Sequence, residues 1–302
     1  MNELQEEIKQ LKKMKHAVIL AHYYVPDEVQ EIADYIGDSF YLSRKVRDTE
    51  ADVLVFAGVS FMGESAKILN PEKKVLLPDP EADCAMAHMA DVETIHRMRK
   101  KYPDLAVVCY INSTAELKAE ADVCVTSSNA VDIVKKLPNQ TIFFIPDKNL
   151  ASYVASQVPE KHMIYNDGFC PVHKAITPLD VKKAKEAHPD ALLLVHPECE
   201  KEVLHEADFV GSTSELITFA QKADQKEFLI GTEDGVLYEL RQKNPEKRFY
   251  VIHSRQCCVD MKKVTLEKVY TCLKDEINEV HVNEETGKRA KRALNRMLEM
   301  AK

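Results

Sequence analysis

The sequence predicts an α/β protein made of three related αβα units, each a three-layer sandwich around a parallel sheet. Strand-like and helical segments alternate along the 302 residues, three kinds of strand recur in the same order, and polar pairs stand at matching strand ends. The length is about twice that of a typical domain, so several units are expected. The alternative is a single doubly wound sheet whose alternation of strands and helices imitates a repeat.

The recurring strands fall into three sets. The first set is AVILAHYY (17–24), AVVCYINS (106–113) and ALLLVHPE (191–198). The second begins with Glu-Ala-Asp at positions 50, 120 and 206, and the third is KVLLPD (74–79), TIFFIPD (141–147) and EFLIGTED (227–234). Between them lie segments with helical periodicity, such as VQEIADYI, AVDIVKKL and LITFAQKA. This order predicts parallel sheets covered by helices.

The predicted units span residues 1–85, 86–171 and 172–264. The helical segments within 265–302 lead into no fourth unit, so we expect them to pack back on the first unit and complete it. With pseudo-threefold symmetry, the three units would form a triangle around a central cavity.

Composition and charge narrow the function classes. The formal net charge is −8, so a general affinity for nucleic acid or an anionic membrane is not expected. No apolar stretch approaches the roughly 20 residues of a membrane span, and the N-terminal segment lacks the apolar core of a signal peptide. We therefore expect a cytoplasmic protein whose eight cysteines form no disulfide framework.

Polar pairs spaced i, i+2 follow the strands of the first set, which puts both side chains of a pair on one face of an extended chain. Parallel α/β units bind ligands at the carboxyl ends of their strands. The pairs are therefore candidate site residues, although each alone also fits a hydrogen-bonded polar group at a strand end. They are His22 and Tyr24, Tyr110 and Asn112, and His196 and Glu198.

Small hydroxyl residues follow the strands of the second set. Ser127, Ser212 and Thr213 precede or open predicted helices, where a hydroxyl group can cap the first N–H groups and where the helix terminus attracts anions. They are candidates for binding a carboxylate or phosphate group, with ordinary helix capping as the alternative.

One cysteine per unit stands at an equivalent junction. Cys84 and Cys170 each precede the polar strand end of the next unit by 26 residues, and Cys258 follows Cys170 by 88 residues. Three converging thiolates suit a [4Fe–4S] cluster with one iron free of protein ligands, which can act as a Lewis acid. Zinc and the absence of any metal remain alternatives, and spacing alone does not separate Cys258 from Cys257.

Longer motifs surround these residues: AHYYVPDEVQEIADYIGDS, FAGVSFMGESAK, LLPDPEADCAMA, VVCYINSTAELKA, TSSNA, IPDKNLA, GFCPVH, VHPEC, GSTSE and CCVDMKK. Together they closely resemble the quinolinate synthase family over nearly the whole chain. The resemblance implies a three-domain αβα triangle with one [4Fe–4S] cluster per chain in a central cavity. It also implies the condensation of iminoaspartate with dihydroxyacetone phosphate to quinolinate, phosphate and water, in de novo NAD biosynthesis.

The resemblance implies that the cluster ligands are Cys84, Cys170 and Cys258, because the family's C-x-x-M-K element begins at Cys258 in this sequence. Some members of the family carry C-x-x-C-x-x-C at this point. This chain has only Cys257 and Cys258, which argues against a redox switch here.

Glu198 is the only carboxylate among the strand-end pairs, so it is expected to be the main general acid/base. Tyr24, Tyr110 and His196 are the further expected catalytic residues. The implied substrate pocket consists of His22, Ser39, Tyr110, Asn112, Ser127, His173, His196, Glu198, Ser212 and Thr213.

The implied partners are the two small-molecule substrates, and a transient contact with the enzyme that supplies iminoaspartate is a further possibility. Two other function classes stay open. One is an iron–sulfur hydro-lyase that acts on another small acid without dihydroxyacetone phosphate. The other is a non-enzymatic iron–sulfur sensor, which would need a partner surface or a basic DNA-binding element, and the sequence of this acidic chain shows no basic patch.

Overall fold

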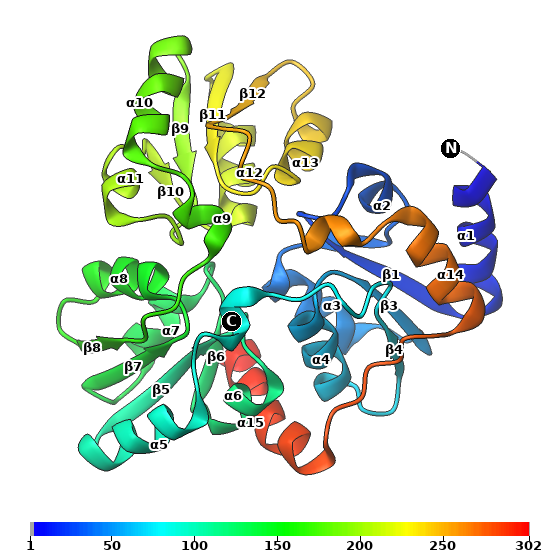
Figure 1. Cartoon of the computed structure of the whole chain (residues 1–302), viewed down its shortest axis with the longest axis horizontal. Coiled ribbons are helices and arrows are strands. Elements are labelled where there is room, and N and C mark those ends of the chain that lie inside the picture. Colours follow the sequence, from blue (N-terminus) through cyan, green and yellow to red (C-terminus); the bar gives the residue numbers. More distant parts are fainter. Residues whose placement is uncertain (1–2, 302) are drawn as a thin grey trace. The chain divides into compact units, whose positions relative to one another are not determined.

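The computed structural model describes residues 3–301, and these contain three four-stranded sheets (Figure 1). The first sheet contains β1 (Ala17–His22), β2 (Tyr35–Gly37), β3 (Val53–Ala57) and β4 (Lys74–Leu76). The second contains β5 (Leu105–Tyr110), β6 (Val123–Val125), β7 (Thr141–Ile145) and β8 (His162–Tyr165). The third contains β9 (Leu192–Val195), β10 (Phe209–Val210), β11 (Glu227–Gly231) and β12 (Arg248–Val251).

All three sheets have the same strand order. They run β2-β1-β3-β4, β6-β5-β7-β8 and β10-β9-β11-β12, so the first strand of each sheet lies between the second and the third. Neighbouring strands pair in parallel. The strands β3 and β5 are buried along their whole length, as expected of parallel strands covered on both faces. The predicted α/β class with three αβα units is confirmed.

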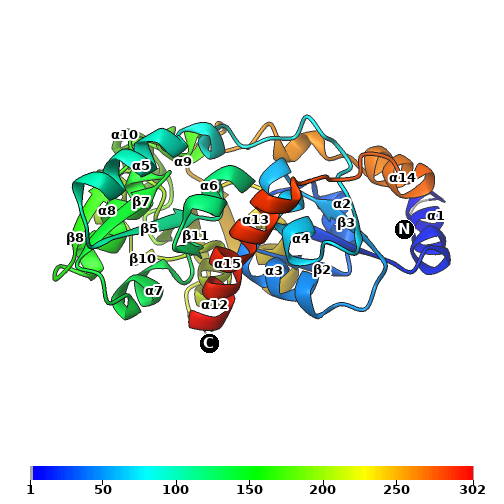
Figure 2. The ribbon, with the colours of Figure 1, turned by 90° about the horizontal axis from the view of Figure 1, so that it is seen from below.

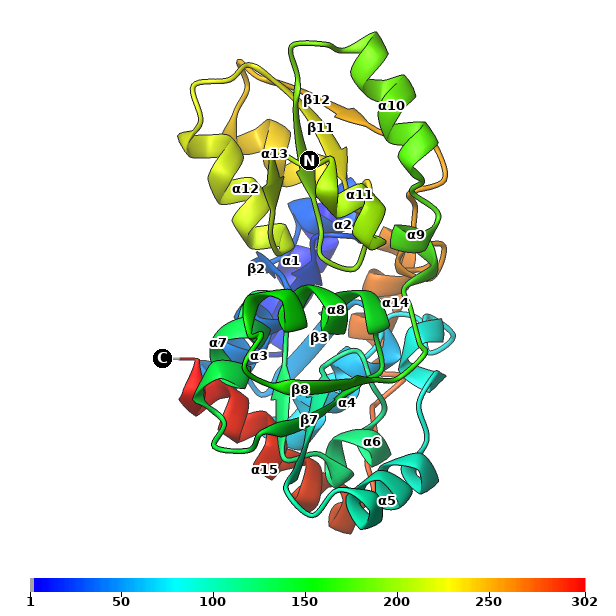
Figure 3. The ribbon, with the colours of Figure 1, turned by 90° about the vertical axis from the view of Figure 1, so that its left-hand side faces the viewer.

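Helices connect and cover the strands. In chain order they are α1 (Glu3–Met14), α2 (Asp27–Glu31), α3 (Ser39–Asp48), α4 (Ser60–Leu69), η1 (Ala85–His88), α5 (Val92–Lys101), α6 (Ala115–Glu120), α7 (Ala130–Lys136), α8 (Lys148–Gln157), α9 (Pro171–Lys174), α10 (Pro178–Ala187), α11 (Lys201–His205), α12 (Thr213–Lys222), α13 (Val236–Lys243), η2 (Met261–Lys263), α14 (Leu266–Asp275) and α15 (Glu284–Met300). Several begin at a side-chain cap: Asp147, Thr177 and Ser212 each accept the backbone N–H three residues on. Figure 3 shows α8 lying over β7 and β8.

The chain forms two compact bodies. The first body contains the residues up to His88, the segment Ile111–Cys124 and the residues from Val259 onward. The second body contains Met89–Tyr110 and Val125–Cys258. The boundaries expected from the sequence, the triangular arrangement and the central cavity remain predictions.

The two C-terminal helices pack within the first body. Helix α14 contacts α1, and α15 contacts α6 and α4 (Figure 2). The buried face of α15 includes Ala290, Leu294 and Met297, which follow helical periodicity. An ion pair between Arg289 and Glu120 joins α15 to α6 at the edge of this face. Both helices are therefore integral to the first body.

The structure corrects the predicted matching of strands in the first unit. The Glu-Ala-Asp segment at 50–52 leads into β3, whereas those at 120–122 and 206–208 lead into the edge strands β6 and β10. The counterpart of these edge strands is β2, which lies partly within VQEIADYI, where we expected only helix. The helix α2 ends at Glu31, and Tyr35 and Ile36 pair with β1 because aromatic and β-branched side chains suit a strand. By the same order, β4 matches β8 and β12, not β7 and β11.

An aspartate before two of the edge strands supports the corrected matching. Asp34 Oδ2 accepts the backbone N–H of Ile19 at 2.8 Å, and Asp208 Oδ2 accepts that of Leu193 at 2.7 Å. Each carboxylate thus links the residue before an edge strand to the neighbouring strand.

Within residues 3–301, no helix combines the length and the apolar character needed to cross a bilayer.

Candidate active site

A buried carboxylate lies between two histidine rings in the second body. Glu198 follows β9, and its Oε2 is 2.7 Å from Nδ1 of His173 and 3.7 Å from Nδ1 of His196. The two rings stack with their centroids 4.7 Å apart. All three side chains are at least 95% buried, so water screens their interactions poorly.

The hydrogen bonds fix which ring nitrogens carry protons. His173 Nδ1 donates to the carboxylate of Glu198, and its Nε2 lies 2.8 Å from the hydroxyl of Thr232. His196 Nδ1 accepts the backbone N–H of Glu198 at 3.3 Å, so its proton is on Nε2, which lies 3.2 Å from Ser127 Oγ. One histidine thus orients the carboxylate and the other presents an N–H toward Ser127.

The charges in this cluster shift two carboxyl groups in opposite directions. Burial by itself raises the pKa of Glu198, but His173, His196 and the Tyr110 side chain outweigh it and lower the pKa below its usual value. Burial and the nearby negative charge of Glu198 raise the pKa of Asp147 well above its usual value. The lowered pKa keeps Glu198 ionised at neutral pH.

One oxygen of Glu198 remains available for chemistry. Oε1 is fully buried and has no hydrogen-bond partner within the described part of the chain. A buried carboxylate oxygen without a donor is costly to maintain, which is typical of a position that a ligand completes. The backbone of this turn is held by Asn149, whose Nδ2 donates to the carbonyl of Glu198 at 3.0 Å.

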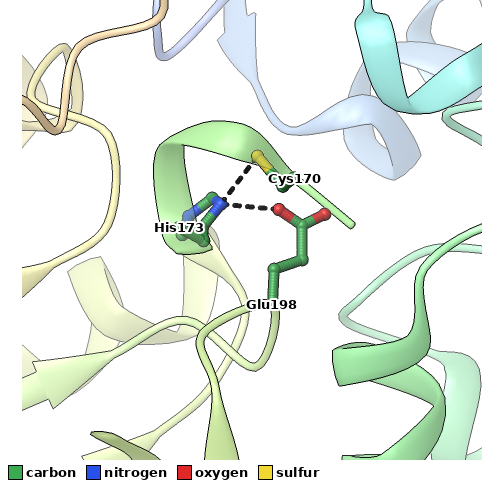
Figure 4. Close-up of side chains that lie close together, drawn as sticks. All are labelled: Cys170, His173 and Glu198. Carbon is green, nitrogen blue, oxygen red and sulfur yellow. Dashed lines mark hydrogen bonds and ion pairs between the residues drawn. The ribbon is translucent and has the colours of Figure 1, made fainter. Parts of the chain in front are cut away.

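A cysteine thiol reaches the same cluster. Cys170 Sγ lies 3.1 Å from Nδ1 of His173, and ligand atoms of Cys170, His173 and Glu198 all lie within 4.8 Å of one another (Figure 4). A metal bound by the Cys170 thiolate would therefore lie next to the carboxylate of Glu198. A second group with this spacing contains Glu233, Asp234 and Cys257.

The loops that carry Cys84, Cys170 and Cys258 are fastened in the same way. After β3, β7 and β11, a backbone N–H donates to a carbonyl two residues before each cysteine. These bonds run from Ser60 to Ala82 at 2.9 Å, from Lys148 to Gly168 at 2.8 Å, and from Asp234 to Gln256 at 2.9 Å. By this bond Cys258, not Cys257, is the structural counterpart of Cys84 and Cys170.

The donor chemistry at these loops fits a metal. Cys84, Cys170, Cys257 and Cys258 are partly exposed, while the other four cysteines are buried. Cys199, for example, lies in the apolar core of the third αβα unit. Soft thiolate ligands on partly exposed loops suit an iron–sulfur cluster or zinc.

The sequence-predicted residues of the first body have their own local geometry. His22 ends β1, and its Nδ1 accepts the backbone N–H of Tyr24 at 3.2 Å, which reproduces the arrangement of His196 and Glu198. Lys262 Nζ donates to the carbonyl of Tyr24 at 2.7 Å. The remaining predicted residues of this body are Ser39, which begins α3, Cys84, whose N–H is bonded to Asp83, and Asn112.

The hydroxyl residues of the second body divide into two roles. Ser127 reaches His196, as described above, whereas Ser212 Oγ accepts the backbone N–H of Glu215 in a capping box at the start of α12. Thr213 is the first residue of that helix and is buried. Ser212 therefore caps a helix, and Ser127 joins the cluster.

The structure thus brings six predicted residues together within the second body and adds three that the sequence analysis missed. The predicted ones are Tyr110, Ser127, Cys170, His173, His196 and Glu198. The additions are Asp147, Asn149 and Thr232. The segment IPDKNLA contains the first two, and an Asp that ends a strand and caps a helix is a signal that could have identified Asp147.

Known proteins match this chain over almost its whole length. A family model described as "Quinolinate synthetase A protein" matches residues 6–299. Quinolinate synthase of Caldicellulosiruptor saccharolyticus is 53% identical over 298 residues, which cover 99% of this chain and 98% of the relative. The Aquifex aeolicus enzyme is 50% identical over 305 residues (99% and 94%), and quinolinate synthase 2 of Methanosarcina acetivorans is 48% identical over 296 residues (98% and 95%). The chain therefore belongs to the quinolinate synthetase A family of enzymes.

Proposed function

We propose that this enzyme condenses iminoaspartate with dihydroxyacetone phosphate to form quinolinate, phosphate and water. The single observation that carries the proposal is Glu198, a buried carboxylate held by His173 with one oxygen unpartnered within the described residues. The match over residues 6–299 supports the same reaction class. De novo NAD biosynthesis in the cytoplasm is the corresponding cellular role.

We propose that Cys84, Cys170 and Cys258 hold one [4Fe–4S] cluster per chain. The equivalent fastening of the three loops and the partial exposure of the three thiols support this ligand set. When bound, a cluster with one iron free of protein ligands supplies a Lewis acid that assists loss of a hydroxyl group.

Glu198 acts as the main general acid/base in the proposed mechanism. Ring formation requires removal of a proton beside a carbonyl or imine carbon, and Oε1 is the oxygen free to accept it. The bond from His173 to Oε2 keeps Oε1 facing the site while the proton is held. The proton is then delivered to a departing hydroxyl group, so the carboxylate returns to its ionised form. Substrate and product are at the same oxidation level, so no external oxidant is required.

Polar donors around the carboxylate bind and orient the anionic substrates. His196 Nε2 and Ser127 present an N–H and a hydroxyl group that suit a carboxylate or phosphate oxygen. Tyr110 can donate to an oxyanion as it develops. We assign Tyr24 a parallel role on the evidence of its strand-end position, and we assign substrate binding to the remaining residues His22, Ser39, Asn112, His173, Ser212 and Thr213. A transient contact with the enzyme that supplies iminoaspartate is part of the same proposal.

The experiment that tests the proposal is anaerobic purification followed by iron and sulfide counts, a visible absorption spectrum and a quinolinate assay. About four irons and four sulfides per chain are expected for the cluster type, with quinolinate formed only when both substrates are present. Turnover of a hydroxy acid without dihydroxyacetone phosphate would instead identify a hydro-lyase. A protein that holds zinc or no metal after reconstitution would overturn the proposed cluster.

A further inference from the structure

We propose that Asp147 and Glu233 are positioning residues that hold two of the metal-ligating cysteines by their backbone. Each buried carboxylate accepts the N–H of the cysteine itself: Asp147 Oδ2 from Cys170 at 3.1 Å, and Glu233 Oε1 from Cys258 at 2.9 Å. The inference rests on the proposed function to the extent that Cys170 and Cys258 are ligands.

The two carboxylates occupy equivalent places in their sheets. Asp147 stands two residues after the end of β7 and Glu233 two residues after the end of β11, and β7 and β11 hold the same position in the strand order. Both side chains are fully buried. The same type of contact therefore recurs at the same point of two αβα units, which a chance hydrogen bond would not do.

Each carboxylate also fastens the strand-to-helix turn on which it stands. The second oxygen of Asp147 accepts the N–H of Leu150 at 2.6 Å, and the second oxygen of Glu233 accepts the N–H of Gly235 at 2.7 Å. One side chain thus links the turn to the cysteine loop. A carboxyl group is needed for this, because an amide of the same shape replaces one acceptor oxygen with an NH₂ group that would face another N–H.

Neighbouring bonds hold the same two loops against the same two turns. Asn166 Nδ2 donates to the carbonyl of Pro146 at 3.0 Å, and Gln256 Nε2 donates to the carbonyl of Thr232 at 2.6 Å. The loop before Cys170 also approaches very closely, since a Cβ at Gly168 would lie 2.5 Å from the carbonyl oxygen of Pro146. Of these contacts, only the carboxylates of Asp147 and Glu233 bond the cysteine itself.

The first αβα unit reaches the same result with a different residue. Its equivalent position, two residues after β3, is Val59, which has no acceptor. There Asp83, which directly precedes Cys84, accepts the cysteine N–H at 2.7 Å and also bonds Ser60. Every one of the three predicted ligands therefore has its backbone N–H bonded to a carboxylate, which points to a requirement of the ligand loop and not of one particular turn.

The physical effect expected is restriction of the cysteine backbone before the metal binds. A cysteine whose N–H is fixed samples fewer backbone conformations, so less conformational entropy is lost when its thiolate is held in one geometry. The bond also keeps this N–H directed to the carboxylate, away from the sulfur, whose hydrogen bonds influence cluster properties. Loss of the carboxylate should thus free one loop and speed loss of the metal.

Three variants of the full chain test this. Asp147→Asn and Glu233→Gln leave one acceptor oxygen for two N–H groups, and we expect that oxygen to stay with the turn, so the bond to the cysteine is lost. Asp147→Ser keeps an acceptor for the helix cap but is too short to reach Cys170. Asp208→Asn is the matched control, because its carboxylate also accepts one backbone N–H, that of Leu193, in the same body. Hydrogen exchange by mass spectrometry on the metal-free proteins and the rate of iron loss to a chelator on the metal-loaded ones are the readouts.

We expect exchange at least 10-fold faster at residues 168–172 in both Asp147 variants, with 256–260 unchanged, and the reverse pattern in Glu233→Gln. Iron loss should be at least threefold faster in all three variants than in Asp208→Asn. Local exchange equal to that of the control would overturn the inference, as would faster exchange spread evenly over the second body. If the wild-type protein binds no cluster, the proposed function fails, but the site-specific exchange pattern still decides the positioning role.

Discussion

Nδ1 of His173 lies 2.7 Å from Oε2 of Glu198, and both side chains are almost completely buried. The pair forms inside the second body, between residues that sequence analysis takes from two separate motifs. The low pKa of Glu198 sets its charge, and the bond from His173 to Oε2 sets its orientation, before any substrate arrives. The other oxygen, Oε1, has no hydrogen-bond partner within residues 3–301.

Glu198→Gln removes the proton acceptor while it keeps the size of the side chain. We expect quinolinate formation to fall by at least about 100-fold, the lower end of what general acid/base catalysis contributes. The iron content and visible spectrum should match those of the wild-type protein, because Glu198 is not a proposed ligand. Turnover near the wild-type rate would remove Glu198 from the mechanism.

Adjacent cysteines provide a matched pair of variants. Cys258→Ser should lose the cluster, because Cys258 is the residue that corresponds to Cys84 and Cys170 in the fastening of the loops. Cys257→Ser should keep about the wild-type iron content, measured after anaerobic purification. The opposite result, with iron lost only in Cys257→Ser, would reverse the assignment of the third ligand.

The acid stability of the first body should depend on Glu276. Bonds from Lys15, at 2.6 Å, and Lys74 lower the pKa of Glu276 to about 2. A lowered folded-state pKa contributes stability that is complete above the unfolded-state value near 4.5 and is lost as the pH falls toward 2. Glu276→Gln should therefore destabilise the protein at pH 7, by about 0.5 kcal/mol because the groups are near the surface.

The difference in the free energy of unfolding between wild type and Glu276→Gln should shrink as the pH falls from about 5 to below about 3, because the pKa of Glu276 is near 4.5 in the unfolded chain and about 2 in the folded protein. Chemical denaturation at a series of pH values measures it. Glu284→Gln is the control, because Glu284 pairs with Lys288 on an exposed face of α15 and should give no measurable change. A Glu276→Gln effect that stays constant with pH would contradict the ion-pair explanation.

Lys118 should be needed for stability because it is fully buried among polar partners. Its Nζ donates to Ser65 Oγ at 2.9 Å and to the carbonyl of Phe61 at 3.3 Å, and its charge opposes the rise that burial causes in the pKa of Glu64. Lys118→Met should cost about 3 kcal/mol, the lower end for breaking a buried pair.

Adding Glu64→Gln to Lys118→Met should recover part of this loss, since the uncompensated carboxyl group is then gone. Thermal unfolding of the two single variants and the double variant gives the coupling. Strictly additive effects would show that Glu64 and Lys118 do not interact.

The alternating pattern was sufficient to predict the fold class, but it matched β3 and β4 to the wrong strands of the other sheets and did not include β2, β8 and β12. Apolar β-rich runs such as AVILAH and LAVVCY became buried strands as expected. The edge strand Tyr35–Gly37 was missed because it has three residues and follows a short helix within a segment of helical periodicity. This segment is a strand because it pairs with β1, and the local sequence pattern does not show that pairing.

At the site, spacing could predict the residues that stand at strand ends and not those that support them. His196 and Glu198 follow from the i, i+2 pattern after β9. The partnership of His173 with Glu198 joins positions 25 residues apart in sequence, and the bond from Asn149 to the Glu198 backbone joins positions 49 apart. Contacts of this kind depend on how the loops return to the sheet, which the sequence does not display.

The bond that fastens each cysteine loop closes an excursion of the chain: the polypeptide leaves a strand, runs through a helix and a further strand or strand-like segment, and comes back to the point of departure. Insertions or deletions within such an excursion leave its two ends where they were. The excursions from Ser60 to Ala82 and from Asp234 to Gln256 have the same length, and that from Lys148 to Gly168 is two residues shorter. All three end on the same bond, so a small difference in loop length leaves the position of each thiol relative to its strand unchanged.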